Sequence, residues 1–138
     1  MSEKNDQLKI LTFGYGNRRD YDQFIDYLES YQVEYVVDVR IKPRAWSRKW
    51  YGQEIKNLCL SKNIDYISQT NLGNISGKAH WIPPDEKAAE IALEKVAELA
   101  RNGTVLLLCA ELDPRRCHRT EVADKLEKIV PLPVHHLK

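Results

Sequence analysis

The sequence has no run of eighteen apolar residues and almost no excess of charge of either sign. The first absence argues against a transmembrane helix, which needs about 20 predominantly apolar residues in a row. The first seven residues, MSEKNDQ, are polar and acidic, whereas a secretory signal is basic and then apolar. We therefore expect a cytoplasmic protein without a membrane partner. The net charge is +1, from 21 basic and 20 acidic residues, so only the local distribution of charge can indicate a partner.

Cysteine is scarce as well, with three residues in a chain of 138. An odd number of cysteines in a reducing compartment predicts free thiols instead of a disulfide framework. A chain of this length buries roughly 65 to 70% of its extended surface, so it can fold without disulfides or metal ions. We expect one domain over residues 1–138, a flexible N-terminus at 1–7, and neither a cofactor nor a metal site.

The sequence also lacks an internal repeat and a linker, and it alternates strand and helix patterns. The expected strands cover residues 9–13, 35–39, 64–67, 104–109 and 132–136. The expected helices cover residues 20–31, 53–61, 85–101 and 117–128, and residues 71–84 are expected to form a long surface loop. Two strands are nearly continuous apolar runs, which is typical of strands covered on both faces. The pattern predicts a single doubly wound α/β sheet, mostly parallel, of about five strands with helices on both faces.

Ligands of such sheets bind where the strands end, in the loops that lead into the helices. One of these loops, residues 40–52 (RIKPRAWSRKWYG), has a local charge of +5 and interleaves cations with aromatic rings. Its cations are Arg40, Lys42, Arg44, Arg48 and Lys49, and its aromatic residues are Trp46, Trp50 and Tyr51. Cations neutralise phosphates and exposed indoles stack on bases, so the loop favours a nucleotide or nucleic acid partner. The alternative is a solvated basic loop whose tryptophans fold back over the sheet.

The loop after the first strand, TFGYGN at residues 12–17, lacks the third glycine of a dinucleotide fingerprint and the Gly-Lys-Ser/Thr of a Walker loop. A turn that needs glycine dihedrals explains it more simply. Tyr15, Asn17 and Arg18 remain candidate ligand contacts. The loop with Lys78, His80 and Trp81 is either a lid over a ligand or a docked surface loop.

The richest stretch, LLLCAELDPRRCHRTEVADKL at 106–126, crowds thiols, acids, an imidazole and arginines into one strand-to-helix turn. We place this turn at the exit of the fourth strand, facing the exits of the first and second. Cys109 ends an apolar strand and reads as a buried hydrophobe. Cys117 is expected at a helix start, where amide dipoles and neighbouring arginines favour the thiolate.

Several chemistries fit this turn to different degrees. Cys109 and Arg115 have the Cys-x5-Arg spacing of phosphatase loops, but Glu111, Asp113 and Pro114 oppose phosphate binding there. A zinc site of Cys109, Cys117 and His118 lacks the paired short spacing of structural sites and a fourth ligand. A dithiol switch between the two cysteines requires their Cα atoms to approach within about 7 Å, so this possibility stays open.

The remaining functional interpretation of this turn is an anion-binding site in which acidic side chains of the same turn partly balance the arginines. Arg116 and Arg119 would bind phosphate or carboxylate at the helix start. Glu111 and Asp113 would fix those arginines or accept from a ligand hydroxyl. His118 would act as a donor or general base. A purely structural ion-pair network explains the same composition.

The ordered motifs of this chain resemble the family known as domain of unknown function 488. They are Thr12-x-Gly14, Asp38-Val39-Arg40-x-x-Pro43, Leu72-Gly73, Leu108-Cys109-Ala110-Glu111 and Cys117-His118-Arg119. The chain departs from the usual family pattern at residues 15–17, where members often have His-Ser, and at Asn74, where a second glycine is common. The resemblance implies a small α/β domain without an established activity. It also implies that one site contains Asp38, Arg40, Cys109, Glu111, Cys117, His118 and Arg119.

Two functional hypotheses follow. In the first, a phosphate-bearing small molecule or nucleic acid is held by Asp38, Arg40, Arg44, Trp46 or Trp50, Arg116 and Arg119, with Tyr15 and Asn17 beside it. In the second, the protein is a thiol-dependent enzyme or redox sensor centred on Cys117, with His118 and Glu111 as its other catalytic residues.

Overall fold

The computed structural model describes residues 8–16, 18–45, 47–78, 80–111, 113, 115 and 117–138. Residues 1–7, expected to be a flexible N-terminus, lie outside this set. The strands are β1 (Ile10–Gly14), β2 (Val33–Asp38), β3 (Asp65–Ser68), β4 (Thr104–Cys109) and β5 (Val134–His136). The α-helices are α2 (Asp22–Ser30), α3 (Gly52–Ser61), α4 (Glu86–Ala100) and α5 (Arg119–Ile129). Two short 3-10 helices are η1 (Arg48–Trp50) and η2 (Thr70–Leu72).

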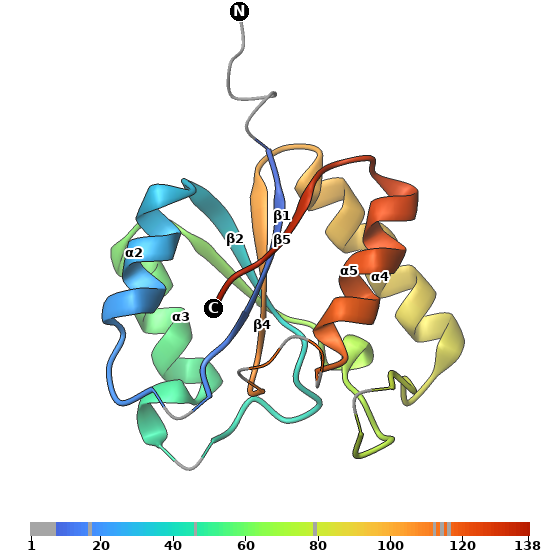
Figure 1. The fold of residues 1–138 in the computed structure, drawn as a ribbon, viewed down its shortest axis with the longest axis horizontal. Coiled ribbons are helices and arrows are strands. Elements are labelled where there is room, and N and C mark those ends of the chain that lie inside the picture. Colours follow the sequence, from blue (N-terminus) through green and yellow to red (C-terminus); the bar gives the residue numbers. More distant parts are fainter. Residues whose placement is uncertain are drawn as a thin grey trace, which may run out of the picture.

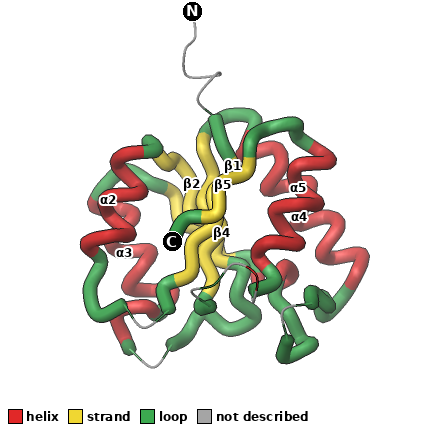
Figure 2. The backbone as a smooth tube through the Cα atoms, viewed as in Figure 1, coloured by secondary structure: helices red, strands yellow, loops and turns green. Residues whose placement is uncertain are grey.

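The five strands form one parallel sheet in the order β3-β2-β4-β1-β5. Helices α2 and α3 lie on one side of the sheet, and α4 and α5 lie on the other (Figure 1). Figure 2 shows the strands as one layer between the two pairs of helices. The predicted α/β class and the predicted strand number are confirmed, and the sheet is parallel throughout.

Side chains of the central strand β4 alternate between two cores, as the period of two in a strand requires. Val105, Leu107 and Cys109 belong to the core beneath α4 and α5. Leu106 and Leu108 belong to the core beneath α2 and α3. All six residues of β4 are buried, so the apolar run TVLLLC reflects burial on both faces.

The strand register brings three strand exits together. β4 lies between β1 and β2, with Gly14 opposite Cys109 and Asp38 opposite Leu108. The loops after β1 and β2 lead to helices on one face, whereas the loop after β4 leads to α5 on the other face. Neighbouring loops that diverge in this way leave a crevice at the carboxyl end of the sheet. The expected position of the fourth strand's exit, beside the exits of the first two strands, is confirmed.

Helix α5 begins two residues later than its sequence pattern predicts. Arg119 is its first residue and His118 is its N-cap, so Cys117 lies outside the helix. The His118 side chain does not cap the helix because its imidazole hydrogen-bonds to β2's exit instead. The turn before α5 is therefore held by contacts with another strand.

The loop at 73–85 is docked on the protein. Trp81 is buried in the core beneath α4 and α5, and its indole N–H donates to the carbonyl of Gly73 at 2.9 Å. The backbone N–H of Trp81 donates to the carboxylate of Glu121 on α5 at 3.2 Å. These contacts favour the interpretation of this segment as a docked surface loop over its interpretation as a lid that closes on a ligand. No helix in the described part of the chain is long and apolar enough to cross a bilayer.

Candidate functional site: a cysteine and histidine cluster where β4 ends

Cys109 and Cys117 are joined in a disulfide. Cys109 is the last residue of β4, and Cys117 follows the turn that leads to α5. Their Cα atoms lie 7.3 Å apart, and both residues are buried, at 6% and 5% exposure. The expectation of free thiols was wrong for this pair, because Cys117 lies beside the end of β4 with its sulfur against that of Cys109. Cys59, by contrast, is a free thiol in the other core, and burial raises its pKa to about 12.

His118 lies against both sulfurs. Its Nδ1 is 3.9 Å from the Sγ of Cys109 and 3.9 Å from the Sγ of Cys117. Its Nε2 lies 2.9 Å from the carbonyl oxygen of Val39 at the exit of β2. A carbonyl can only accept, so Nε2 carries the hydrogen and Nδ1 presents its lone pair to the sulfurs. Burial lowers the pKa of His118 and so favours this neutral imidazole.

Asp38 and Arg40 form a buried ion pair at the end of β2. The guanidinium Nε donates to Oδ1 at 2.8 Å and Nη2 donates to Oδ2 at 2.6 Å. The remaining guanidinium nitrogen, Nη1, donates to the carbonyls of Trp50 at 2.7 Å and Arg44 at 3.2 Å. Burial alone would lower the pKa of Arg40, but the Asp38 carboxylate outweighs it and raises that pKa. Through these hydrogen bonds, Arg40 attaches the basic loop at residues 40–52 to the end of β2.

The aromatic residues of this region stack inward. The Tyr15 ring stacks on the Trp50 ring at 5.0 Å with an interplanar angle of 9°, and the Arg40 guanidinium lies 5.4 Å from the Tyr15 ring centroid. Trp50 is buried and its indole N–H donates to the carbonyl of Arg18. The hypothesis that Trp50 stacks on a base is wrong, because the Trp50 ring fills the core beneath α2 and α3.

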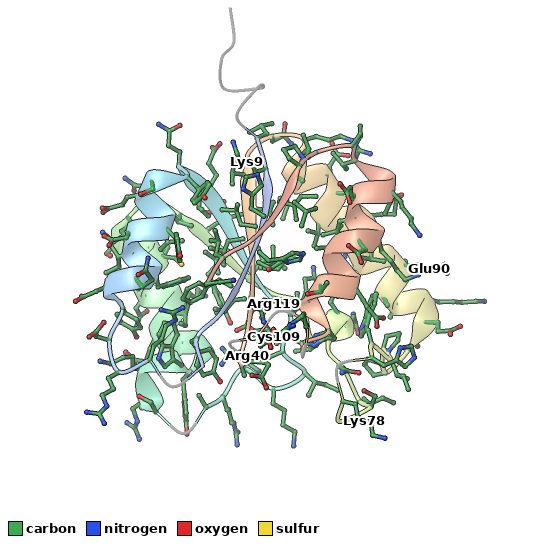
Figure 3. All side chains as sticks on the ribbon, viewed as in Figure 1. Lys9, Arg40, Lys78, Glu90, Cys109 and Arg119 are labelled. Carbon is green, nitrogen blue, oxygen red and sulfur yellow. A yellow bond between two sulfur atoms is a disulfide. The ribbon has the colours of Figure 1, made fainter. Side chains whose placement is uncertain are left out.

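Arg119 is the first residue of α5, and its side chain is fully buried. It donates to the backbone carbonyl of Glu111, which Gly14 approaches so closely that any Cβ there would collide with it. Burial lowers the pKa of Arg119 to about 10, although the acids Glu111 and Asp113 oppose this shift. Figure 3 shows Arg40, Cys109 and Arg119 gathered at the carboxyl end of the sheet, opposite Lys9.

Other predicted positions lie apart from this cluster or are not described. Arg44 is exposed on the basic loop. Arg115 is 89% exposed and pairs with Asp113, so it does not close over Cys109 as a phosphatase arginine would. Asn17, Trp46 and Arg116 lie outside the described residues.

A pocket of about 490 Å³ opens where the β1 exit meets the basic loop. Its polar lining includes Arg18, Arg19, Ser47 and the backbone of Gly16. The sequence indicated Arg18 as a candidate ligand contact because it lies in the loop with the glycine turn. It did not indicate Arg19 or Ser47. Both depend on how the two loops meet in space. The Val39 carbonyl that orients His118 could not be found from side-chain types either, because it is a backbone atom.

These features define an α/β protein with a parallel five-stranded sheet and a cysteine and histidine cluster at its carboxyl edge. The family model described as domain of unknown function DUF488 matches residues 20–126. This match spans most of the chain, so the chain belongs to that family and the predicted resemblance to it is confirmed. Searches of curated proteins and of solved structures found no match.

Proposed function

We propose that the protein is a redox sensor in which Cys109 and Cys117 switch between dithiol and disulfide, with His118 as the base. The observation that carries this proposal is the contact of His118 Nδ1 with both bonded sulfurs, at 3.9 Å each. The sensor is favoured over an enzyme acting on protein disulfides because both sulfurs are buried. Thiol–disulfide exchange depends on access to the sulfur, and a small disulfide or dithiol needs less access than a folded partner does.

The oxidation step follows from this geometry. In the dithiol form, neutral His118 accepts the proton of one thiol, and the resulting thiolate attacks a small disulfide RSSR. One RS⁻ leaves and a mixed disulfide forms. The second cysteine, deprotonated in turn, attacks the mixed disulfide, which closes the Cys109–Cys117 bond and releases the second RS⁻. The two thiol protons pass to the leaving thiolates, so one RSSR yields two RSH.

Alkylation after redox equilibration tests the switch. The full chain is equilibrated with mixtures of reduced and oxidised glutathione, quenched in acid, unfolded, alkylated and weighed. We expect two species, one with a single alkylated cysteine, Cys59, and one with all three alkylated. The Cys59→Ala variant is the matched control and should give zero and two. A protein that keeps all three thiols in fully oxidised glutathione would overturn the proposal.

His118→Asn tests the role of the base. General bases typically contribute 10²- to 10⁴-fold, so we expect exchange near neutral pH to slow by about 100-fold. The loss should shrink as pH rises, because hydroxide then replaces the imidazole. Circular dichroism checks that the variant folds. An unchanged rate in a folded variant would remove His118 from the mechanism.

A second candidate function is the binding of a phosphate-bearing ligand, such as a nucleotide or nucleic acid, in the pocket at the β1 exit. It is supported by Arg18 and Arg19 on the pocket wall. Within the described part of the chain, the buried Arg18 Nε has no hydrogen-bond partner. Arg40 and Arg119 serve as internal donors, so this candidate site depends on Arg18 and Arg19 instead.

Fluorescence anisotropy with labelled ADP and labelled oligothymidylate tests this second function. Phosphate contacts release counterions, so affinity should fall steeply as salt rises. The double variant Arg18→Ala, Arg19→Ala should bind at least about tenfold more weakly, since each phosphate contact contributes to the salt-dependent part of the affinity. Arg101→Ala, an exposed arginine after α4, is the control. Binding that ignores salt, or no binding of either probe, would exclude this function.

A further inference from the structure

The cluster brings three side chains that can bind a metal ion close together, and reduction of the disulfide would free both sulfurs as ligands. The Cys109 and Cys117 sulfurs and the His118 Nδ1 all lie within 4.8 Å of one another, and all three residues are buried. They come from two elements, the end of β4 and the turn before α5. The fold thereby supplies a convergence that the Cys-x7-Cys-His spacing does not reveal.

The orientation of His118 is an independent sign of a ligand site. Histidines that bind metals usually donate their second ring N–H to a carbonyl or carboxylate, which fixes the ring and the tautomer. His118 makes this contact to the Val39 carbonyl at 2.9 Å. The contact comes from the residue that directly follows β2, a strand that supplies none of the three ligands. It aims the lone pair of Nδ1 at the point where the two sulfurs meet.

We propose that the reduced protein binds one thiophilic divalent cation of the Zn²⁺ class through Cys109, Cys117 and His118. This inference rests on the redox proposal above for the supply of the dithiol. A small dithiol reductant transfers two electrons and two protons to the protein disulfide and becomes a disulfide itself. The cation then displaces both thiol protons into solvent. Oxidation of the two thiolates reverses the sequence and releases the ion.

Charge and ligand type select this class of ion. Thiolate and imidazole ligands suit Zn²⁺ and related ions better than Mg²⁺ or Ca²⁺, which prefer oxygen. Two thiolates cancel the charge of a divalent cation and the imidazole is neutral, so the buried complex carries no net charge. Burial of a neutral complex avoids the large desolvation cost of an unpaired ion.

The distances fit after a small movement. Tetrahedral zinc places its sulfur and nitrogen ligands about 3.6 Å apart and two sulfur ligands about 3.8 Å apart. The observed sulfur to Nδ1 distances of 3.9 Å are close to the first value. The Cα separation of 7.3 Å leaves the reduced sulfurs room to move apart. Three protein ligands leave a fourth position for water or a substrate, as in catalytic zinc sites.

Titration with Co²⁺ tests the site, because this ion occupies zinc sites and reports on its ligands by absorption. The full chain is reduced with a phosphine, freed of metal with a chelator and titrated without oxygen. We expect thiolate-to-cobalt charge-transfer bands and intense tetrahedral d–d bands that saturate at one equivalent and disappear when Zn²⁺ is added. The oxidised protein should show neither set of bands.

Variants test whether the cobalt absorption bands depend on Cys109, Cys117 and His118. Cys109→Ser and His118→Asn should each weaken Co²⁺ binding by at least about tenfold, the lower end of what a perturbed ligand shell costs. Cys59→Ser is the matched control and should leave the titration unchanged. A titration without charge-transfer bands, or one unaffected by Cys109→Ser, would overturn the inference. If the redox switch works without cobalt bands, only the metal site fails. Cobalt bands in a protein that never forms the disulfide would refute only the switch.

Discussion

At the carboxyl end of β2, both oxygens of the Asp38 carboxylate accept hydrogen bonds from Arg40 and Tyr66. Asp38 is fully buried and accepts from the guanidinium of Arg40 and from the hydroxyl of Tyr66 at 2.6 Å. Burial and the Asp38 charge both raise the pKa of Tyr66, so its hydroxyl stays protonated as a donor. The Arg40 side chain then reaches the carbonyls of Arg44 and Trp50. Asp38 therefore connects the sheet to the basic loop.

Asp38→Asn should be strongly destabilising. The variant leaves the Arg40 charge buried without its counter-charge, and removal of one partner of a buried ion pair typically costs about 3 to 5 kcal/mol. We expect the free energy of unfolding, measured by urea denaturation, to fall by about 3 kcal/mol. Tyr66→Phe, which removes one hydrogen bond to the same carboxylate, should cost about 1.5 to 3 kcal/mol.

The exposed pair of Lys62 and Glu29 provides the matched control for this prediction. Its atoms lie 3.0 Å apart, but both side chains are partly or largely exposed. Lys62→Ala should therefore cost less than about 1 kcal/mol. If Asp38→Asn costs no more than this surface variant, the buried pair does not hold the basic loop.

At the scale of elements, the sequence predicted what depends on local pattern. β4 ends where its apolar run ends, and the other strands and helices differ by one or two residues at their ends. The apolar spacing predicts these elements well because it depends only on which face or faces of each strand or helix are buried, and not on distant residues. The meeting of the β4 turn with the exits of β1 and β2 was also predictable, because parallel strands end at a common edge.

Contacts between side chains of different loops were not predictable in this way. The disulfide depends on Cys117 lying beside the last residue of β4, a tertiary contact that no periodicity encodes. The burial of Trp50 and Trp81 was hidden for a related reason. Both lie in segments rich in polar residues, and their rings reach cores formed by other elements. The same composition fits an exposed base-stacking platform and a folded-back loop, and only the tertiary structure separates them.

Across the whole molecule, the sheet separates two thiol environments. Cys109 and Cys117 belong to the core beneath α4 and α5, whereas Cys59 belongs to the core beneath α2 and α3. Cys59 is fully buried, and its raised pKa makes it a poor nucleophile at neutral pH. The separation keeps Cys59 away from the other two cysteines, so under the proposed switch we expect oxidation to yield one defined pair instead of a mixture of disulfides.

The redox state should also change the stability of the whole fold. The disulfide closes a short loop, with a sequence separation of 8, and the chain-entropy model gives about 2.5 kcal/mol for a loop of this size. For a chain of this length, that corresponds to a rise in Tm of roughly 8 °C. Calorimetry of the oxidised and reduced protein, both in chelator so that no metal stabilises the dithiol form, measures the difference.

The double variant Cys109→Ser, Cys117→Ser shows whether a change in Tm comes from the disulfide or from another effect of the reductant. Because it cannot form the bond, its Tm should be the same in oxidising and reducing buffer. Cys59→Ala should keep the full difference, since Cys59 lies in the other core. Equal Tm values for the oxidised and reduced wild-type protein would contradict the prediction. They would mean that the turn before α5 is held by His118 and Arg119 alone, so that closing the disulfide could not transmit a redox signal through stability.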